Sequence, residues 1–191
     1  MKNINRRKFL GSGLVAAASL TVGSSFACNQ KQNNMNQDPE LKIKELGLVL
    51  PPAPQAVGLY KHVLVVDNFL YVSGQGPTKP DGSLITGTLG QDMDVEEGQL
   101  AARQVGLTML STIREHFGEL NRIYRIIKVL GMVNSTPSFT QHPSVINGFS
   151  GLMAEVFGPE NGIGTRSAVG MMLPFNIAVE VEAVFELYRQ E

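Results

Sequence analysis

The chain has 191 residues, and 43% of them are hydrophobic, which is enough for one domain with a sizeable core. Residues 1–27 hold four of the sixteen positive charges and none of the seventeen negative ones, so the remainder has a net charge of −5. An acidic domain without a basic cluster is a poor nucleic-acid binder, because contacts with the phosphate backbone need Lys and Arg. A single cysteine excludes an internal disulfide framework.

Residues 1–27 are predicted to be a twin-arginine signal peptide. The segment Asn5-Arg6-Arg7-Lys8-Phe9-Leu10 has the form of that export signal. The apolar stretch that follows, residues 11–26, is shorter than the roughly 20 residues of a membrane span and suits the hydrophobic region of a cleaved signal. We therefore expect an exported protein.

Two kinds of processing remain open for this signal. Residues 25–27, Ser-Phe-Ala, end in a small residue, as the cleavage site of a soluble periplasmic protein does. Alternatively, Cys28 is the acylated first residue of a lipoprotein, and the membrane is then contacted only through that lipid. Residues 28–40 have too little apolar content to pack, so we expect a polar tether before a domain at 41–191.

The first part of that domain contains signals for a short helix and a hairpin. Residues 39–46 are predicted to form a helix, because Gly47 follows as a usual helix C′ residue. Residues 62–66 and 69–73 are predicted to form two strands joined by the turn Asp67-Asn68.

The middle of the domain contains two long helices with a strand between them. Asp94 and Glu97 have the spacing of a capping box and open a helix that runs to about Phe117. Residues 122–133 are rich in Ile, Val and Leu and predict a strand, and residues 144–157 predict the second helix. One face of the first helix is apolar at helical spacing, through Ala102, Val105, Met109, Ile113 and Phe117.

The segment 164–186 is predicted to form two strands joined by a short turn. The first strand carries Arg166 among small and apolar residues. The second alternates apolar residues with Glu180 and Glu182, so that the carboxylates share one face. An arginine fork opposite a row of carboxylates would hold an anionic substrate and move protons beside it.

The predicted order is therefore strand, strand, helix, strand, helix, strand, strand. Helices between strands, but few of them, predict an α+β domain. We expect a single mixed β-sheet with two helices packed on one face.

From about Pro52 to the end, the order and spacing of several motifs resemble the RidA/YjgF family of small trimeric proteins. Two further segments resemble the branch of that family labelled chorismate-mutase-like or "putative endoribonuclease"; they are residues 125–134, RIIKVLGMVN, and 145–150, VINGFS. The motifs that carry the family resemblance are Tyr60, residues 71–77 (YVSGQGP), Lys128-Val129, Arg166-Ser167, Leu173-Pro174 and residues 179–183 (VEVEA).

This resemblance implies a chorismate-mutase-like fold and a homotrimer with three ligand clefts between subunits. It implies hydrolysis of reactive 2-enamine and 2-imine acids, such as 2-aminoacrylate, to 2-oxo acids and ammonia. No cofactor and no metal are expected. His62, His116 and His142 lack the close spacing of a zinc site and are expected at the surface or at edges.

The resemblance also implies roles for individual residues. Arg166 matches the arginine that clamps the substrate carboxylate, and Glu180 matches the glutamate that positions or deprotonates the attacking water. Ser73 is not expected to be a nucleophile, because it lacks a GxSxG setting. The implied substrate-binding residues are Tyr60, Ser73 and an asparagine position that is filled by either Asn147 or Ser150. Glu182, the neighbour of Glu180 on the same face of its strand, is also expected to bind substrate.

Two departures suggest a different ligand. Ala168 stands where the family's enzymes often have a cysteine, and the turn before Glu180 is one residue shorter. The alternative function is a non-catalytic binding trimer for small carboxylates. Ribonuclease activity is disfavoured by the net charge of −5.

Overall fold

The computed structural model describes residues 37–189 of the chain. The predicted export signal, Cys28 and most of the predicted polar tether lie outside the described residues. No helix between residues 37 and 189 is long and apolar enough to cross a membrane. The elements are α1 (Pro39–Glu45), β1 (Val63–Val66), β2 (Phe69–Gln75), α2 (Val95–His116), η1 (Leu120–Arg122), β3 (Ile123–Asn134), α3 (His142–Phe157), α4 (Pro159–Gly162), β4 (Thr165–Met171), η2 (Pro174–Asn176) and β5 (Val179–Leu187).

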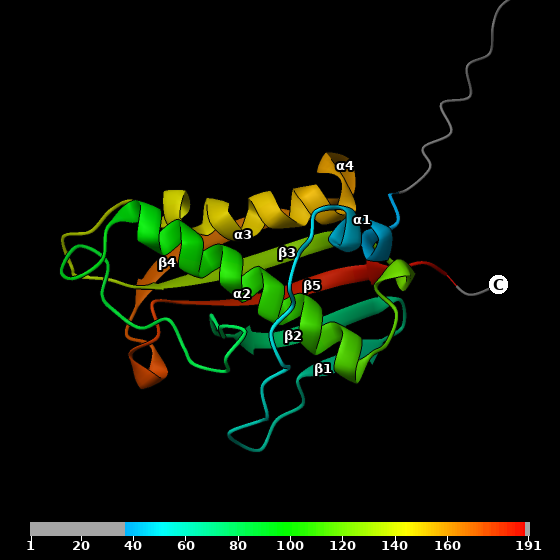
Figure 1. Cartoon of the computed structure of the whole chain (residues 1–191), viewed down its shortest axis with the longest axis horizontal. Helices are drawn as coiled ribbons and strands as arrows, with labels where there is room; N and C mark the ends of the chain where they lie inside the picture. The colour runs from blue at the N-terminus through cyan, green and yellow to red at the C-terminus, as the bar shows by residue number, and fades with distance from the viewer. Residues whose placement is uncertain (1–36, 190–191) are drawn as a thin grey trace, which may run out of the picture. The chain divides into compact units, whose positions relative to one another are not determined.

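The strands form one mixed sheet in the order β1-β2-β5-β3-β4. Neighbouring strands are antiparallel except β3 and β4, which are parallel. The long helices α2 and α3 run across the same face of this sheet (Figure 1). The predicted α+β class, with one mixed sheet and two helices on one face, is therefore confirmed.

The core lies between the sheet and these two helices. Helix α2 begins with the predicted capping box, in which Asp94 accepts from the Glu97 N–H and Glu97 accepts from the Asp94 N–H. Strand β5 supplies alternate residues to the core, as its sequence pattern predicts. Its fully or nearly fully buried members are Val179, Val181, Ala183, Phe185 and Leu187.

Strand β3 departs from the simple alternation expected of residues 122–133. Its pairing with β5 shifts register between Ile123 and Arg125, and again between Ile126 and Lys128. Ile123, Ile126 and Val129 are consequently all buried although they are three residues apart. Extra residues in a strand break the period of two, and the composition of an apolar stretch does not reveal them.

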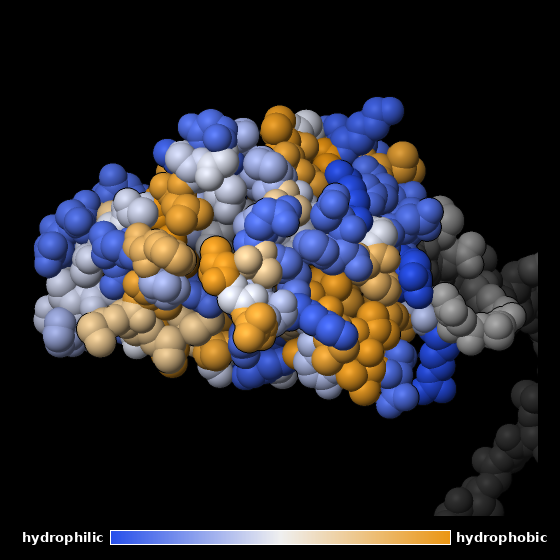
Figure 2. Space-filling view, turned by 90° about the horizontal axis from the view of Figure 1, so that it is seen from below, coloured by the Kyte–Doolittle hydropathy of each residue, from blue (hydrophilic) through white to orange (hydrophobic). Residues whose placement is uncertain are grey.

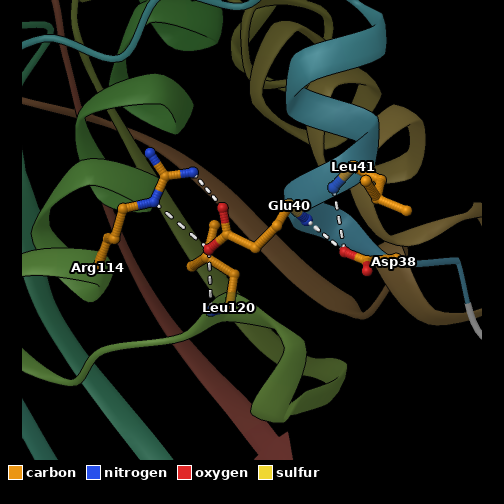
Figure 3. A network of polar contacts seen from close by, with 5 residues as sticks. All are labelled: Asp38, Glu40, Leu41, Arg114 and Leu120. Atoms are coloured by element: carbon orange, nitrogen blue, oxygen red, sulfur yellow. Dashed lines mark hydrogen bonds and ion pairs between the residues drawn. The ribbon is translucent and has the colours of Figure 1, made fainter.

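Helix α1 is held against the rest of the domain by a small polar network (Figure 3). Asp38 caps the helix by accepting from the N–H groups of Glu40 and Leu41. The Arg114 guanidinium, near the end of α2, donates to both carboxylate oxygens of Glu40, which also accepts from the Leu120 N–H. One carboxylate thus joins α1, α2 and η1.

Strand β1 forms one edge of the sheet, and Leu64, Val65 and Val66 are each more than two-fifths exposed there. From the side that faces down in Figure 1, hydrophobic residues form several separate patches divided by polar ones (Figure 2).

Candidate functional site

Arg166 and Glu180 do not face each other across a hairpin, which corrects the expectation for the segment 164–186. Strand β3 lies between β4 and β5. Helix α3 provides the crossover that a parallel pair of strands needs, and β4 pairs in parallel with one side of β3. Strand β5 pairs with the other side of β3. The alternation of apolar and polar residues along a strand shows which side chains share a face, but it does not show which strands lie beside it in the sheet.

The two side chains also point to opposite faces of the sheet. Arg166 is opposite Val129, a core residue, and its guanidinium reaches helix α3. Glu180 lies between the buried residues Val179 and Val181, so it points away from the helices. Within one chain, these two groups cannot contact the same small molecule.

The Arg166 guanidinium is held by three neutral acceptors from one helix. Its Nη1 donates to Asn147 Oδ1 at 3.0 Å and to Ser150 Oγ at 2.9 Å, and its Nη2 donates to the Pro143 carbonyl at 3.2 Å. Both candidates for the asparagine position therefore contact Arg166. Asn147 and Ser150 are three residues apart in helix α3, which places their side chains on the same face of the helix.

This arrangement leaves the Nε–H of the guanidinium without an acceptor among the described residues. No ion pair between described residues includes Arg166. Burial lowers the pKa of Arg166 from its ordinary value, but an arginine stays charged in proteins. The Nε and Nη2 edge matches a carboxylate in bidentate geometry.

Glu180 lies in a different place, in the wall of a cavity of about 430 Å³. Tyr60 and Ser73 line the same cavity, so three of the predicted site residues come together there. Its other polar residues include His62, Gln75 and Thr78. Its apolar lining consists of Pro54, Val57, Leu84, Pro174, Phe175 and Ile177.

Burial raises the pKa of Glu180 above its ordinary value of 4.5, and the nearby negative charge of Glu182 raises it further. A carboxylate in such surroundings takes up a proton more readily than one in water. This property suits a group that accepts a proton from one atom and returns it to another.

Ser73 and Tyr60 have supporting positions in the cavity wall. The Ser73 hydroxyl donates to the Lys61 carbonyl at 2.6 Å, and the Ser73 N–H donates to the His62 carbonyl at 3.0 Å. These bonds tie β2 to the segment before β1 and give the hydroxyl a structural partner. Tyr60 is partly exposed and contacts the His62 ring edge to face, with a centroid distance of 5.4 Å.

Glu182, predicted as a substrate-binding residue, does not line the cavity that holds Glu180. It lies further along the open face of the sheet, in a hollow of about 210 Å³ shared with Tyr71, Lys128 and Leu130. Glu182 affects Glu180 through its negative charge, which raises the pKa of the Glu180 carboxyl group.

His62 is a cavity residue that the sequence analysis missed: it directly precedes the edge strand β1, as an edge position was expected to, but it is buried rather than at the surface. Its side chain is only 7% exposed, and neither ring nitrogen has a hydrogen-bond partner among the described residues. The ring stacks on His116 with a centroid distance of 4.8 Å. Burial and the nearby His116 lower the pKa of His62. Its place just before a strand of apolar residues was the only signal of burial in the sequence.

Phe175 is a second residue that sequence reasoning missed. Phe175 and Asn176 have φ angles of 54° and 56°, in the left-handed region, which costs a residue with a side chain about 1–2 kcal/mol. The buried Asn134 amide holds this loop by donating to Asn176 Oδ1 and to the Gly87 carbonyl, both at 2.9 Å. The Phe175 side chain is 68% exposed at the cavity.

Residues 40–187 match the family model described as "YjgF/chorismate_mutase-like, putative endoribonuclease". Protein TCP17 of Trypanosoma cruzi is 42% identical over 146 residues, which cover 76% of this chain and 91% of that protein.

Two crystal structures have similar folds and moderate sequence identity. The protein Atu1372 of Agrobacterium tumefaciens, of unknown function, is 39% identical with a TM-score of 0.70; the match covers 78% of this chain and 94% of that one. A "putative endoribonuclease" from Shewanella oneidensis MR-1 is 34% identical with a TM-score of 0.74; the match covers 78% of this chain and 99% of that one. By its sequence from residue 40 to residue 187 and by its fold, the chain belongs to the YjgF/chorismate-mutase-like family.

Proposed function

We propose that this protein hydrolyses reactive 2-enamine and 2-imine acids to 2-oxo acids and ammonia, in clefts between the subunits of a homotrimer. Membership of the YjgF family suggests a deaminase-like role on small molecules. The observation that carries the proposal is Arg166, a charged guanidinium that is held by three neutral acceptors and whose Nε–H has no acceptor among the described residues.

The site needs two copies of the chain. Arg166 and Glu180 point to opposite faces of one sheet and are separated by β3. A single ligand reaches both groups only if Arg166 comes from one subunit and Glu180 from its neighbour. The cleft between subunits that the family resemblance implies provides this arrangement.

The chemistry follows from the properties of the two groups. Arg166 binds the substrate carboxylate and fixes the imine carbon in place. Glu180 takes a proton from a water molecule as the water oxygen adds to the carbon of the protonated imine, giving a neutral carbinolamine. The same proton then passes to the carbinolamine nitrogen. The C–N bond breaks as Glu180 takes the proton of the new hydroxyl group, which becomes the carbonyl of the 2-oxo acid, and the departing ammonia takes up this proton to leave as ammonium. The raised pKa of Glu180 suits these transfers. No cofactor takes part in this scheme.

Mixing two inactive variants tests the proposal directly. Arg166→Ala and Glu180→Gln are each expected to abolish turnover of freshly generated 2-aminoacrylate. In trimers formed by co-refolding equal amounts of both, about a quarter of the clefts contain an intact Arg166 and an intact Glu180 from different subunits. We therefore expect about a quarter of the wild-type rate. Activity that stays at the buffer level in the mixture contradicts a shared site, and wild-type rates for Arg166→Ala alone contradict the role of Arg166.

A non-catalytic binding trimer for small carboxylates is the second candidate. The same guanidinium, with its Nε–H not used by any described residue, supports this candidate, because binding a carboxylate needs no proton transfer. Calorimetric binding of pyruvate without turnover of any imine favours this candidate. Cleavage of RNA is disfavoured because the chain after residue 27 carries a net charge of −5.

A further inference from the structure

The cavity that holds Glu180 extends well beyond the reacting atoms. Its volume of about 430 Å³ is within the roughly 300–1,000 Å³ of pockets that bind drug-sized ligands. A three-carbon acid such as 2-aminoacrylate occupies only the part beside Glu180. Besides its polar residues, the wall includes six side chains without charge or hydrogen-bonding groups; they are Pro54, Val57, Leu84, Pro174, Phe175 and Ile177.

Phe175 is held at this cavity by its backbone. Its left-handed conformation is unusual for a bulky residue. The following residue, Asn176, is fixed by Asn134 through its side chain and by the Gly87 N–H through its carbonyl. A network anchored in the buried Asn134 thus keeps a large apolar side chain at the cavity, where it is 68% exposed. Strained residues that the surroundings hold in this way cluster at ligand sites.

We propose that this cavity binds the side chain of the substrate, and that the protein prefers 2-imino and 2-oxo acids with large apolar side chains over three-carbon ones. Phe175 is then a specificity-determining residue that covers the side chain of the bound acid. This inference rests on the proposed function, because it takes Glu180 as the group beside the reacting carbon.

Product binding tests the preference without needing turnover. Calorimetry with full-length protein is expected to show that 4-methyl-2-oxopentanoate binds at least about tenfold more tightly than pyruvate, because each additional methylene in an apolar pocket contributes to discrimination. Phe175→Ala is expected to reduce this ratio to less than about threefold. The matched control is Met172→Ala, on the same β4–β5 connection, because Met172 is 97% exposed and does not line the cavity. Leu84→Ala, which changes another apolar residue of the same cavity, repeats the test if Phe175→Ala does not fold.

The outcomes separate this inference from the proposed function. Equal affinities for the two acids in the wild type overturn the inference, and so does a ratio that survives both Phe175→Ala and Leu84→Ala. If the ratio is present but no imine is turned over faster than in buffer, the proposed catalysis fails and the apolar preference stands. If imines are turned over without regard to side-chain size, the catalysis stands and the preference fails.

Discussion

Gly74 and Glu180 lie side by side on the neighbouring strands β2 and β5, so closely that a Cβ atom at position 74 would be 2.0 Å from Glu180 Oε1. Between Val72 and Gln75, the register of these strands shifts, which places Gly74 in an irregularity of β2. Such bulges are common next to active sites, where they redirect a side chain. Because Gly74 has no side chain, the Glu180 carboxylate lies where a Cβ of residue 74 would be.

Gly74→Ala is therefore expected to displace the Glu180 carboxylate. The glutamate side chain is flexible enough to move, so the fold is expected to lose only about 1–2 kcal/mol. Because a catalytic group misplaced by about 1 Å costs up to about a hundredfold in rate, we expect kcat to fall at least about tenfold. Imine-hydrolysis rates over a range of pH are the measurement, since moving Glu180 also moves its pKa. An unchanged rate and pH profile contradict this role of Gly74.

The contacts of Arg166 predict a second effect on activity. Removing both side-chain acceptors, in Asn147→Ala combined with Ser150→Ala, leaves the charge of Arg166 but frees the guanidinium to rotate. We expect kcat/KM to fall by about tenfold to a hundredfold through loss of orientation. Steady-state kinetics measure this, with the exposed Ser138→Ala as the control. Equal kinetics for both variants contradict a positioning role for α3.

Two glycines of helix α3 predict opposite effects on stability. A Cβ at Gly148 would be 1.9 Å from the Gln99 carbonyl oxygen of α2, and this backbone atom cannot rotate away. We expect Gly148→Ala to lower the free energy of unfolding by about 2–3 kcal/mol. A Cβ at Gly151 meets nothing within 4 Å. Gly151→Ala is therefore expected to raise the free energy of unfolding by about 0.5–1 kcal/mol. Urea unfolding of the two variants is the measurement, and a similar change in both contradicts the close crossing of α2 and α3.

The raised pKa of Glu180 predicts a pH-dependent cost to stability. The folded chain keeps this proton at pH values where the unfolded chain has lost it, so the contribution of Glu180 to stability falls as pH rises from 4.5 through the raised pKa. Glu180→Gln removes the titration and keeps the shape of the side chain. We expect Glu180→Gln to be more stable than the wild type near pH 7, with a smaller difference near pH 4. Unfolding curves at several pH values test this, and a difference that does not depend on pH contradicts it.

The lowered pKa of His62 predicts that stability falls as the pH falls, which is opposite to the effect of Glu180. Its pKa is lowered in the folded chain, so the unfolded chain binds the proton first as pH falls below the ordinary value of 6.5. Stability is therefore expected to fall in this range in the wild type. In His62→Phe, which keeps a ring against His116 but does not titrate, this loss is expected to be smaller. Thermal unfolding from about pH 7 to about pH 5 measures the difference.

Local signals in the sequence were sufficient to predict α1, the two long helices and the five strands, but not the short elements α4, η1 and η2. The capping box of Asp94 and Glu97 marks the start of α2, and the alternation along β5 shows which of its residues enter the core. These features depend on contacts between residues that are close in the chain, so their spacing is visible in the sequence. The bulges of β3 and β2 were not predictable, because they depend on the pairing with β5.

The sequence by itself determined the mixed sheet with its helices, the family, and the residue types of the candidate site. Only the tertiary structure decided that Arg166 and Glu180 lie on opposite faces, with β3 between them, and that His62 and Phe175 line the cavity. The physical reason is that element type follows from local hydrogen bonds and side-chain periodicity. The choice of strand neighbours follows instead from how α3 crosses the sheet and where buried groups such as Asn134 find their partners.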